Sequence, residues 1–265
     1  MTNDDVLALF DEEMRRKPAI ADPRYRFELA GRVARILGPT HESYDNCVIF
    51  SAFQPGQTDR IVVEQITYFE DRRRGFEWKV LDHDKPDNLP RRLVDYGFQP
   101  GEAETLHVLP TDAVPRFRAP AAGIAVQRIE DEARLPDVAA VHTQVWRDDR
   151  GWLVEELARD LAERPQAIAV FVACDAENPV GTLWARFAPS GVFASVWGAA
   201  VVPEAPEAAV LGGLVTAVTR AAAERGVRFL AITTPTAAGS ALTRHGFRAV
   251  SRIRNFAWRQ PGLRR

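Results

Sequence analysis

The chain has 265 residues, of which 46% are apolar and 26% charged, a globular composition with room for one large domain or two smaller ones. Its 34 Lys and Arg nearly balance its 36 Asp and Glu, and the formal net charge of −2 gives no broad field to attract nucleic acid or an anionic membrane. No apolar run is long enough to span a bilayer, and the first residues are acidic where a secretory signal would be basic. We therefore expect a cytoplasmic protein with neither nucleic acid nor membrane as a partner.

The first part of the chain alternates helical and strand patterns. Helices are predicted over residues 4–16, 58–74 and 88–96, and strands over residues 46–53, 76–81 and 103–109. Pro110, Pro115, Pro120 and Gly123 then break either regular structure, which predicts a linker over residues 110–123. The sequence thus predicts a first domain over residues 1–118 and a second over residues 123–265.

The second part begins with a strand over residues 124–129 and helices over residues 133–146 and 152–163. Three strands follow, over residues 167–174, 180–187 and 192–202, and Trp184 and Trp197 on these strands are expected in the core. Cys47 and Cys174 lie far apart in apolar strand patterns without other metal-binding side chains beside them. We therefore expect reduced, buried thiols and no metal site.

The two parts contain a weak internal repeat. The stretch from Gly75 to Gly97-Phe98 has a strand, a short helix and a glycine turn, and the stretch from Gly226 to Gly246-Phe247 has the same order and nearly the same length. This indicates a degenerate duplication, although the same order of elements also recurs by chance in mixed folds.

A strand-to-helix junction follows the last of the three strands. Pro203 stops the strand, a polar turn contains Pro206, and a helix covers residues 208–224. Unpaired N–H groups and the positive end of the helix dipole at such a helix start suit an anion such as a pyrophosphate.

The strand order, Val201-Val202-Pro203 and Gly246-Phe247 resemble the acyl-CoA-binding half of the GNAT (N-acetyltransferase) superfamily. The resemblance implies a mixed α/β fold with two GNAT-like halves, the second nearly complete and the first a partial partner without its own phosphate loop. It also implies acetyl-CoA as co-substrate and no metal. By position in the family's pattern, the cofactor-binding residues would be Ala199, Ala200, Val201, Glu207, Ala208, Ala209, Val210, Leu211, Gly212, Gly213 and Thr234.

The phosphate loop departs from the family's pattern. Glu207, Ala209 and Leu211 stand where the family has glycines, and Pro206 stands where it has a basic residue. Glu207 adds negative charge beside the expected anion, and Leu211 adds bulk where the backbone must approach it. A shifted register would bring Gly212 to the last glycine position. The alternative is a helix start that binds nothing.

The catalytic groups are not fixed by the sequence. Leu242 stands at the position of the family's tyrosine acid, and Ser240, His245 and His142 are the remaining candidates, although surface, capping or packing roles also explain each of them. Trp146 and Trp152 bracket a polar loop in the region where the family shapes its acceptor pocket. They predict a flat or cationic acceptor, or else they pack beneath that loop.

The resemblance therefore predicts acetyl transfer from acetyl-CoA to the amine of a small molecule or a peptide N-terminus. One alternative is a non-catalytic ligand- or partner-binding module that has lost efficient acetyl-CoA binding. A second is a scaffold, and a homodimer is compatible with any of these.

Overall fold

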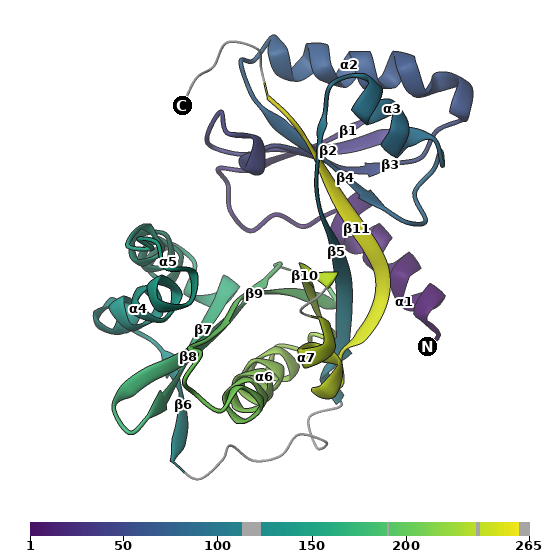
Figure 1. Cartoon of the computed structure of the whole chain (residues 1–265). Coiled ribbons are helices and arrows are strands. Elements are labelled where there is room, and N and C mark those ends of the chain that lie inside the picture. The colour runs from purple at the N-terminus through teal and green to yellow at the C-terminus, as the bar shows by residue number, and fades with distance from the viewer. Residues whose placement is uncertain (113–122, 190, 237–238, 260–265) are drawn as a thin grey trace. The chain divides into compact units, whose positions relative to one another are not determined.

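The computed structural model describes residues 1–112, 123–189, 191–236 and 239–259 (Figure 1). It divides into two compact units. The first contains Met1–Leu106, Thr233–Gly239 and Ala249–Arg265, and the second contains His107–Ile232 and Ser240–Arg248. The compact units are therefore not two consecutive halves of the chain. The domain boundary expected near residue 118 lies outside the described residues.

The first unit has a mixed sheet in the order β1-β2-β3-β4-β11-β5. Its strands are β1 (Arg26–Ala30), β2 (Val33–Leu37), β3 (Cys47–Ser51), β4 (Phe76–Leu81), β5 (Gln99–Pro110) and β11 (Arg248–Trp258). Its helices are α1 (Asn3–Phe10), which continues as a π-helical turn over Asp11–Arg16, α2 (Thr58–Glu70) and α3 (Leu89–Asp95). β3 and β4 are parallel, whereas β1, β2 and β3 pair antiparallel. α2 and α3 lie on one face of this sheet (Figure 1). The core includes Val48, Phe69 and Trp78.

The last strand of the chain belongs to the first unit. β11 pairs antiparallel with β4, with Phe256 opposite Trp78. Phe256 is buried, and the ring centroids of Phe98 and Trp258 lie 5.3 Å apart. Burial of these aromatic side chains explains why β11 completes this sheet and does not stay with the half of the chain that precedes it.

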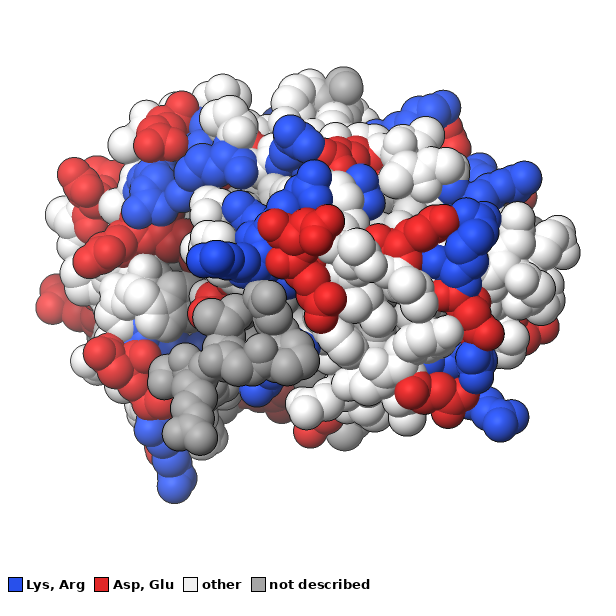
Figure 2. Space-filling model, turned by 90° about the horizontal axis from the view of Figure 1, so that it is seen from above, with Lys and Arg blue, Asp and Glu red and all other residues white. Residues whose placement is uncertain are grey.

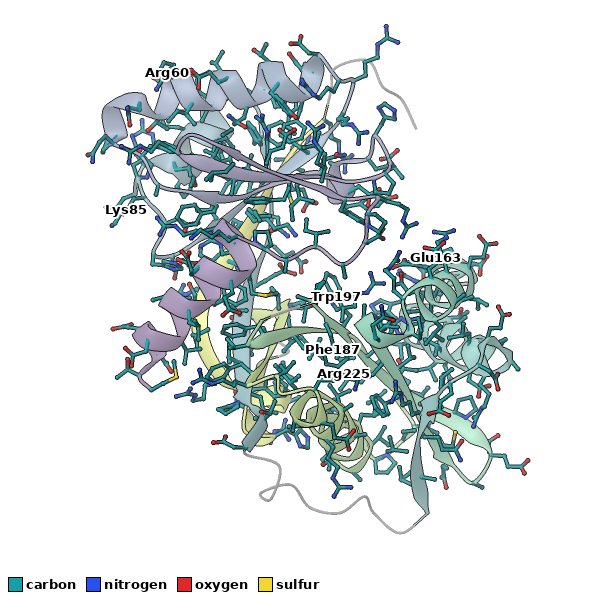
Figure 3. The ribbon with its side chains drawn as sticks, turned by 180° about the vertical axis from the view of Figure 1, so that it is seen from behind. Arg60, Lys85, Glu163, Phe187, Trp197 and Arg225 are labelled. Atoms are coloured by element: carbon teal, nitrogen blue, oxygen red, sulfur yellow. The ribbon has the colours of Figure 1, made fainter. Side chains whose placement is uncertain are left out.

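The second unit has helices on both faces of its sheet (Figure 1). The strand order is β5-β10-β9-β8-β7-β6, with β6 (Ile124–Ile129), β7 (Ile168–Asp175), β8 (Asn178–Phe187), β9 (Phe193–Val201) and β10 (Phe229–Pro235). The helices are α4 (Leu135–Trp146), α5 (Trp152–Glu163), α6 (Glu207–Glu224) and α7 (Gly239–Arg244). α6 covers one apolar cluster, and α4 with α5 covers another. At one end of the sheet, the Arg225 guanidinium lies 4.5 Å from the ring centroid of Phe187 (Figure 3).

Both cysteines are free and buried, as predicted. No helix among the described residues has the length and apolarity needed to cross a membrane. On the face of the protein seen in Figure 2, basic and acidic side chains lie next to one another without a broad patch of one sign. That face therefore offers no continuous cationic surface.

Candidate functional site

β9 loses one of its two neighbours after its first three residues. Its parallel pairing with β10 runs from Phe193 opposite Phe229 to Ser195 opposite Ala231, and within the described residues no later pair joins these strands. Its antiparallel pairing with β8 continues to Val201. The second half of β9 therefore has backbone N–H and C=O groups along an edge that β10 does not pair.

A β-bulge interrupts this half of β9. Thr182 pairs with Ala200, but Trp184 pairs with Trp197, and so Gly198 and Ala199 together oppose one residue of β8. Gly198 has φ +62°, and a Cβ added there would lie 1.7 Å from the Trp184 ring. Only glycine fits this position, because both the backbone conformation and the Trp184 ring exclude a side chain.

His142 reaches the bulge from α4 through a buried hydrogen-bond network. Its Nε2 lies 3.1 Å from Thr182 Oγ1, which donates to the Gly198 carbonyl oxygen over 2.9 Å. His142 is 5% exposed and Thr182 is fully buried. Burial, as the largest cause, and the charge of Arg150 lower the pKa of His142 to about 4, although a hydrogen bond with the Gly198 backbone opposes them. The ring is therefore neutral at pH 7.

Tryptophan side chains are exposed in this unit. Trp197 on β9 is 52% exposed (Figure 3), which shows that the prediction of a core position was wrong. It lies two residues after Ser195, the last residue that pairs with β10, and its Nε1 donates to Ser195 Oγ. Trp184 is buried, as predicted. Trp146 and Trp152, at the end of α4 and the start of α5, are 46% and 53% exposed, so packing beneath the loop does not account for either side chain.

At the start of α6, some of the residues predicted to bind phosphate are exposed and the others are buried. The helix begins at Glu207 without a side-chain cap; Glu207 and Ala208 are exposed, and Ala209 is half-buried. The next four residues, Val210, Leu211, Gly212 and Gly213, are buried. The exposed helix start is therefore the only part of this predicted set that solvent reaches freely among the described residues.

Gly212 packs against His245. A Cβ added to Gly212 would lie 3.2 Å from His245 Cε1, so the glycine accommodates a side chain of this protein. Burial lowers the pKa of His245, the neighbouring Arg244 lowers it further, and Glu207 opposes them. Glu204, also in the turn before α6, is exposed and accepts a hydrogen bond from Gln144.

The remaining predicted residues are dispersed. Ser240 is exposed and its carbonyl oxygen accepts from Arg244, whereas Leu242 is buried in the core. Thr234 lies near the end of β10, in a part of that strand that belongs to the first unit, and its buried hydroxyl oxygen has no hydrogen-bond partner among the described residues. Sequence reasoning missed Thr182 and Gly198, although a glycine inside a strand pattern is the usual signal of a bulge.

One group of described side chains has the composition of a metal site. Asp11, His83 and Asp84 in the first unit have ligand atoms within 4.8 Å of one another. Arg15, 3% exposed, already donates to both carboxylates. The guanidinium supplies the positive charge that a metal ion would bring, and the group is an ion-pair network.

Neither a protein-family model nor a curated protein matches the sequence. Solved structures do match. A GCN5-related N-acetyltransferase from Kribbella flavida has a TM-score of 0.71 at 14% identity, covering 98% of this chain and 95% of the other. One from Sphaerobacter thermophilus has a TM-score of 0.61 at 15% identity, covering 89% and 83%. A tandem GNAT protein from the clavulanic acid biosynthesis pathway has a TM-score of 0.60 at 14% identity, covering 90% and 84%.

The likeness covers nearly the whole chain in the first of these structures, and the third is a tandem protein, in line with two GNAT-like halves. This chain therefore has the fold of the GCN5-related N-acetyltransferases (GNAT).

Proposed function

We propose that the protein is an acyl-CoA-dependent N-acetyltransferase that uses acetyl-CoA to acetylate the amine of a small molecule or a peptide N-terminus. The observation that carries this proposal is the unpaired half of β9, which has a glycine bulge and leads directly to an uncapped helix start.

The diphosphate of the co-substrate would lie at the start of α6. The N–H groups of Glu207 and Ala208 are at the positive end of an 18-residue helix, and both residues are exposed. The pantetheine arm carries amide groups and can pair with the unpaired edge of β9, as an added strand does. Ala199, Ala200 and Val201 then supply main-chain groups along the arm.

The reaction needs little from side chains. The neutral amine attacks the thioester carbonyl, the new C–N bond forms, and the C–S bond breaks after a tetrahedral intermediate. The amine proton passes to solvent or a base, and the departing thiolate takes a proton. Backbone N–H groups at the bulge can stabilise the oxyanion, and a thiolate is a tolerable leaving group even though Leu242 supplies no proton.

The exposed indoles favour a cationic or flat acceptor. Trp146 and Trp152 present about half of their surface to solvent, and Trp197 does the same on β9. An indole face attracts an ammonium group by about 0.5–2 kcal/mol. We propose that these rings collect the protonated amine before it loses its proton and reacts.

A thermal-shift titration with acetyl-CoA tests the proposal. Binding to the native state should raise the melting temperature with co-substrate concentration. Thiol release should then follow when an amine panel of polyamines, aminoglycosides and short peptides is added. No shift at millimolar acetyl-CoA would contradict the proposed function.

The second candidate is a binding module without catalysis. It is favoured by Glu207, whose exposed carboxylate adjoins the anion position, and by the buried Leu242 at the place of the family's acid. A thermal shift without thiol release from any acceptor would select this candidate.

A further inference from the structure

The hydrogen bonds that link His142, Thr182 and the Gly198 carbonyl oxygen have fixed donors and acceptors. The single hydroxyl hydrogen of Thr182 is donated to the Gly198 carbonyl oxygen. Thr182 Oγ1 can then only accept from His142 Nε2, which lies 3.1 Å away and must carry the ring hydrogen. Both side chains are more than nine-tenths buried, so water does not compete for these bonds. The network ends on a backbone oxygen of the bulge.

This oxygen determines the orientation of a neighbouring N–H group. The Gly198 C=O and the Ala199 N–H belong to one planar trans peptide and point in opposite directions. Thr182 on β8 and His142 on α4 hold the oxygen on the β8 side of β9. The Ala199 N–H is therefore directed away from β8, toward the edge where pairing with β10 has ended.

The Trp184 ring holds the same peptide from a second direction. Three ring atoms lie within 2.3 Å of the position that a Cβ on Gly198 would occupy, so the ring rests against the Gly198 backbone. Trp184 is 6% exposed and packs in the core beneath α4 and α5. The peptide cannot rotate toward the α4 side without displacing a buried indole.

We propose that His142 and Thr182 are positioning residues that hold the Gly198–Ala199 peptide so that the Ala199 N–H donates to the carbonyl oxygen of a bound thioester. This inference rests on the proposed function. His142 acts through Thr182 and through its own hydrogen bond with the Gly198 backbone, and it exchanges no proton with the reacting atoms. Among the candidates named from the sequence, it is therefore not the general base.

The test is the isotope-edited infrared spectrum of acetyl-CoA labelled with ¹³C at the thioester carbonyl and bound to the full-length protein. A directed hydrogen bond to the carbonyl lowers its stretching frequency, and this readout needs no acceptor and no turnover. The wild-type protein should show a lowered frequency. Thr182→Val should lose most of this shift, while the Kd for free CoA changes less than about threefold, because the phosphate contacts at α6 remain.

Three further variants separate positioning from folding. Thr219→Val is the matched control, because Thr219 is also fully buried and its hydroxyl donates to a backbone carbonyl, that of Val215, within α6. It should leave the carbonyl frequency unchanged. His142→Gln retains an N–H donor near the Nε2 position and should retain most of the shift, whereas His142→Phe should lose it.

The outcomes are distinct. If the wild-type protein binds acetyl-CoA but its carbonyl band is not lowered, or if Thr182→Val retains the full shift, the positioning role is excluded and the proposed function stands. If the wild-type protein does not bind acetyl-CoA at all, the proposed function fails, and this inference fails with it. With an acceptor in hand, Thr182→Val and His142→Phe should lower kcat about tenfold or more and leave the KM for acetyl-CoA within about threefold, whereas Thr219→Val should change neither, as expected for a group that acts in the transition state.

Discussion

Each unit contains one pair of parallel strands that separate, and the two pairs end differently. In the first unit, β3 pairs with β4 only through Cys47 opposite Glu77 and Val48 opposite Trp78. Arg15 then bridges the strands, because its Nε donates to the Ile49 carbonyl oxygen and its Nη1 donates to Asp84 Oδ1. Asp84 in turn accepts from the Leu81 N–H at the end of β4. An internal ion pair occupies this separation.

In the second unit, β9 and β10 separate after Ser195 and Ala231, and the residues that follow on β9 alternate between buried ones, such as Val196 and Ala200, and more exposed ones. Trp197 presents about half of its surface there, and Ala199 is half-buried. The comparison shows that the same strand arrangement can end in two ways. A charged side chain fills the separation in the first unit, whereas the second leaves main-chain groups unpaired, and it is there that we propose the ligand binds.

The largest effect is expected when the Arg15 side chain that bridges β3 and β4 is removed. Arg15→Ala leaves the Asp84 carboxylate, 2% exposed, without its charged partner. Loss of one member of such a buried pair costs about 3–5 kcal/mol of unfolding free energy. Urea denaturation of the full chain measures it.

Arg16→Ala is the control for this variant, because the Arg16 side chain is 50% exposed and its contacts are an exposed ion pair with Glu12 and a position 4.6 Å from the Phe50 ring centroid. It should cost less than about 1 kcal/mol. A similarly small cost for Arg15→Ala would show that no bridge holds β3 and β4. The acetyl-CoA thermal shift should persist in Arg15→Ala, because the proposed site lies in the second unit.

A slightly smaller effect is expected when the bulge of β9 at Gly198 is disturbed. Gly198→Ala places a methyl group against the Trp184 ring at φ +62°. Backbone strain and overpacking together should cost about 2–4 kcal/mol. The carbonyl shift of bound acetyl-CoA should disappear.

Gly226→Ala separates the two causes in this variant. Gly226 has φ +73°, but no atom lies within 4 Å of an added Cβ. Only the backbone strain applies, so the cost should be about 1 kcal/mol. Equal costs for the two alanine variants would mean that the Trp184 contact has no energetic consequence.

The third prediction concerns the loss of folding stability at low pH. The second unit buries a neutral histidine, His142, whereas the first unit buries the Arg15–Asp84 ion pair. The pKa of His142 is about 4 in the folded protein, against 6.5 for an unperturbed histidine. Below pH 6.5 the unfolded chain binds a proton that the folded protein does not, so stability falls as the pH drops from about 6.5 to about 4. The loss should reach about 3 kcal/mol.

His142→Gln has no proton to gain over this range. The denaturation midpoint of the wild-type protein should therefore fall more steeply than that of His142→Gln as the pH is lowered from 7.5 to 4. Contributions from carboxylates are common to both proteins and do not change this difference. Parallel curves would show that burial does not hold His142 neutral.

The smallest effect is expected at the start of α6. Glu207→Gln removes a negative charge from the anion position and should tighten CoA binding about two- to fivefold, measured by isothermal titration calorimetry. Glu224→Gln, at the other end of the same helix, is the control and should have no effect. Weaker binding by Glu207→Gln would place the diphosphate elsewhere.

Much of the local structure could be read from the sequence. The predicted strands 76–81 and 124–129 and the helix 152–163 match β4, β6 and α5 residue for residue, because apolar periodicity and turn residues mark them clearly. The β1–β2 hairpin was missed. Its first strand carries Arg26 and Glu28, which form an ion pair on a partly exposed strand and hide the apolar alternation.

The site was predictable only in outline. The junction from β9 to α6 follows from Pro203 and the helix pattern, and His142 was a candidate. Its link to Thr182 and Gly198 depends on strand register, which no local pattern specifies. The exposure of Trp197 likewise depends on where the pairing with β10 ends, and the placement of β11 beside β4 depends on residues far apart in the sequence.

That placement of β11 affects how the protein is made. In the strand order, β11 lies between β4 and β5, so the sheet of the first unit stays incomplete until Arg248–Trp258 has left the ribosome. During synthesis the nascent chain exposes an unpaired β4 edge and the aromatic side chains that Phe256 later covers, a surface prone to aggregation and a ready substrate for chaperones. A gene cut between the two halves would therefore yield two polypeptides that need each other to become soluble.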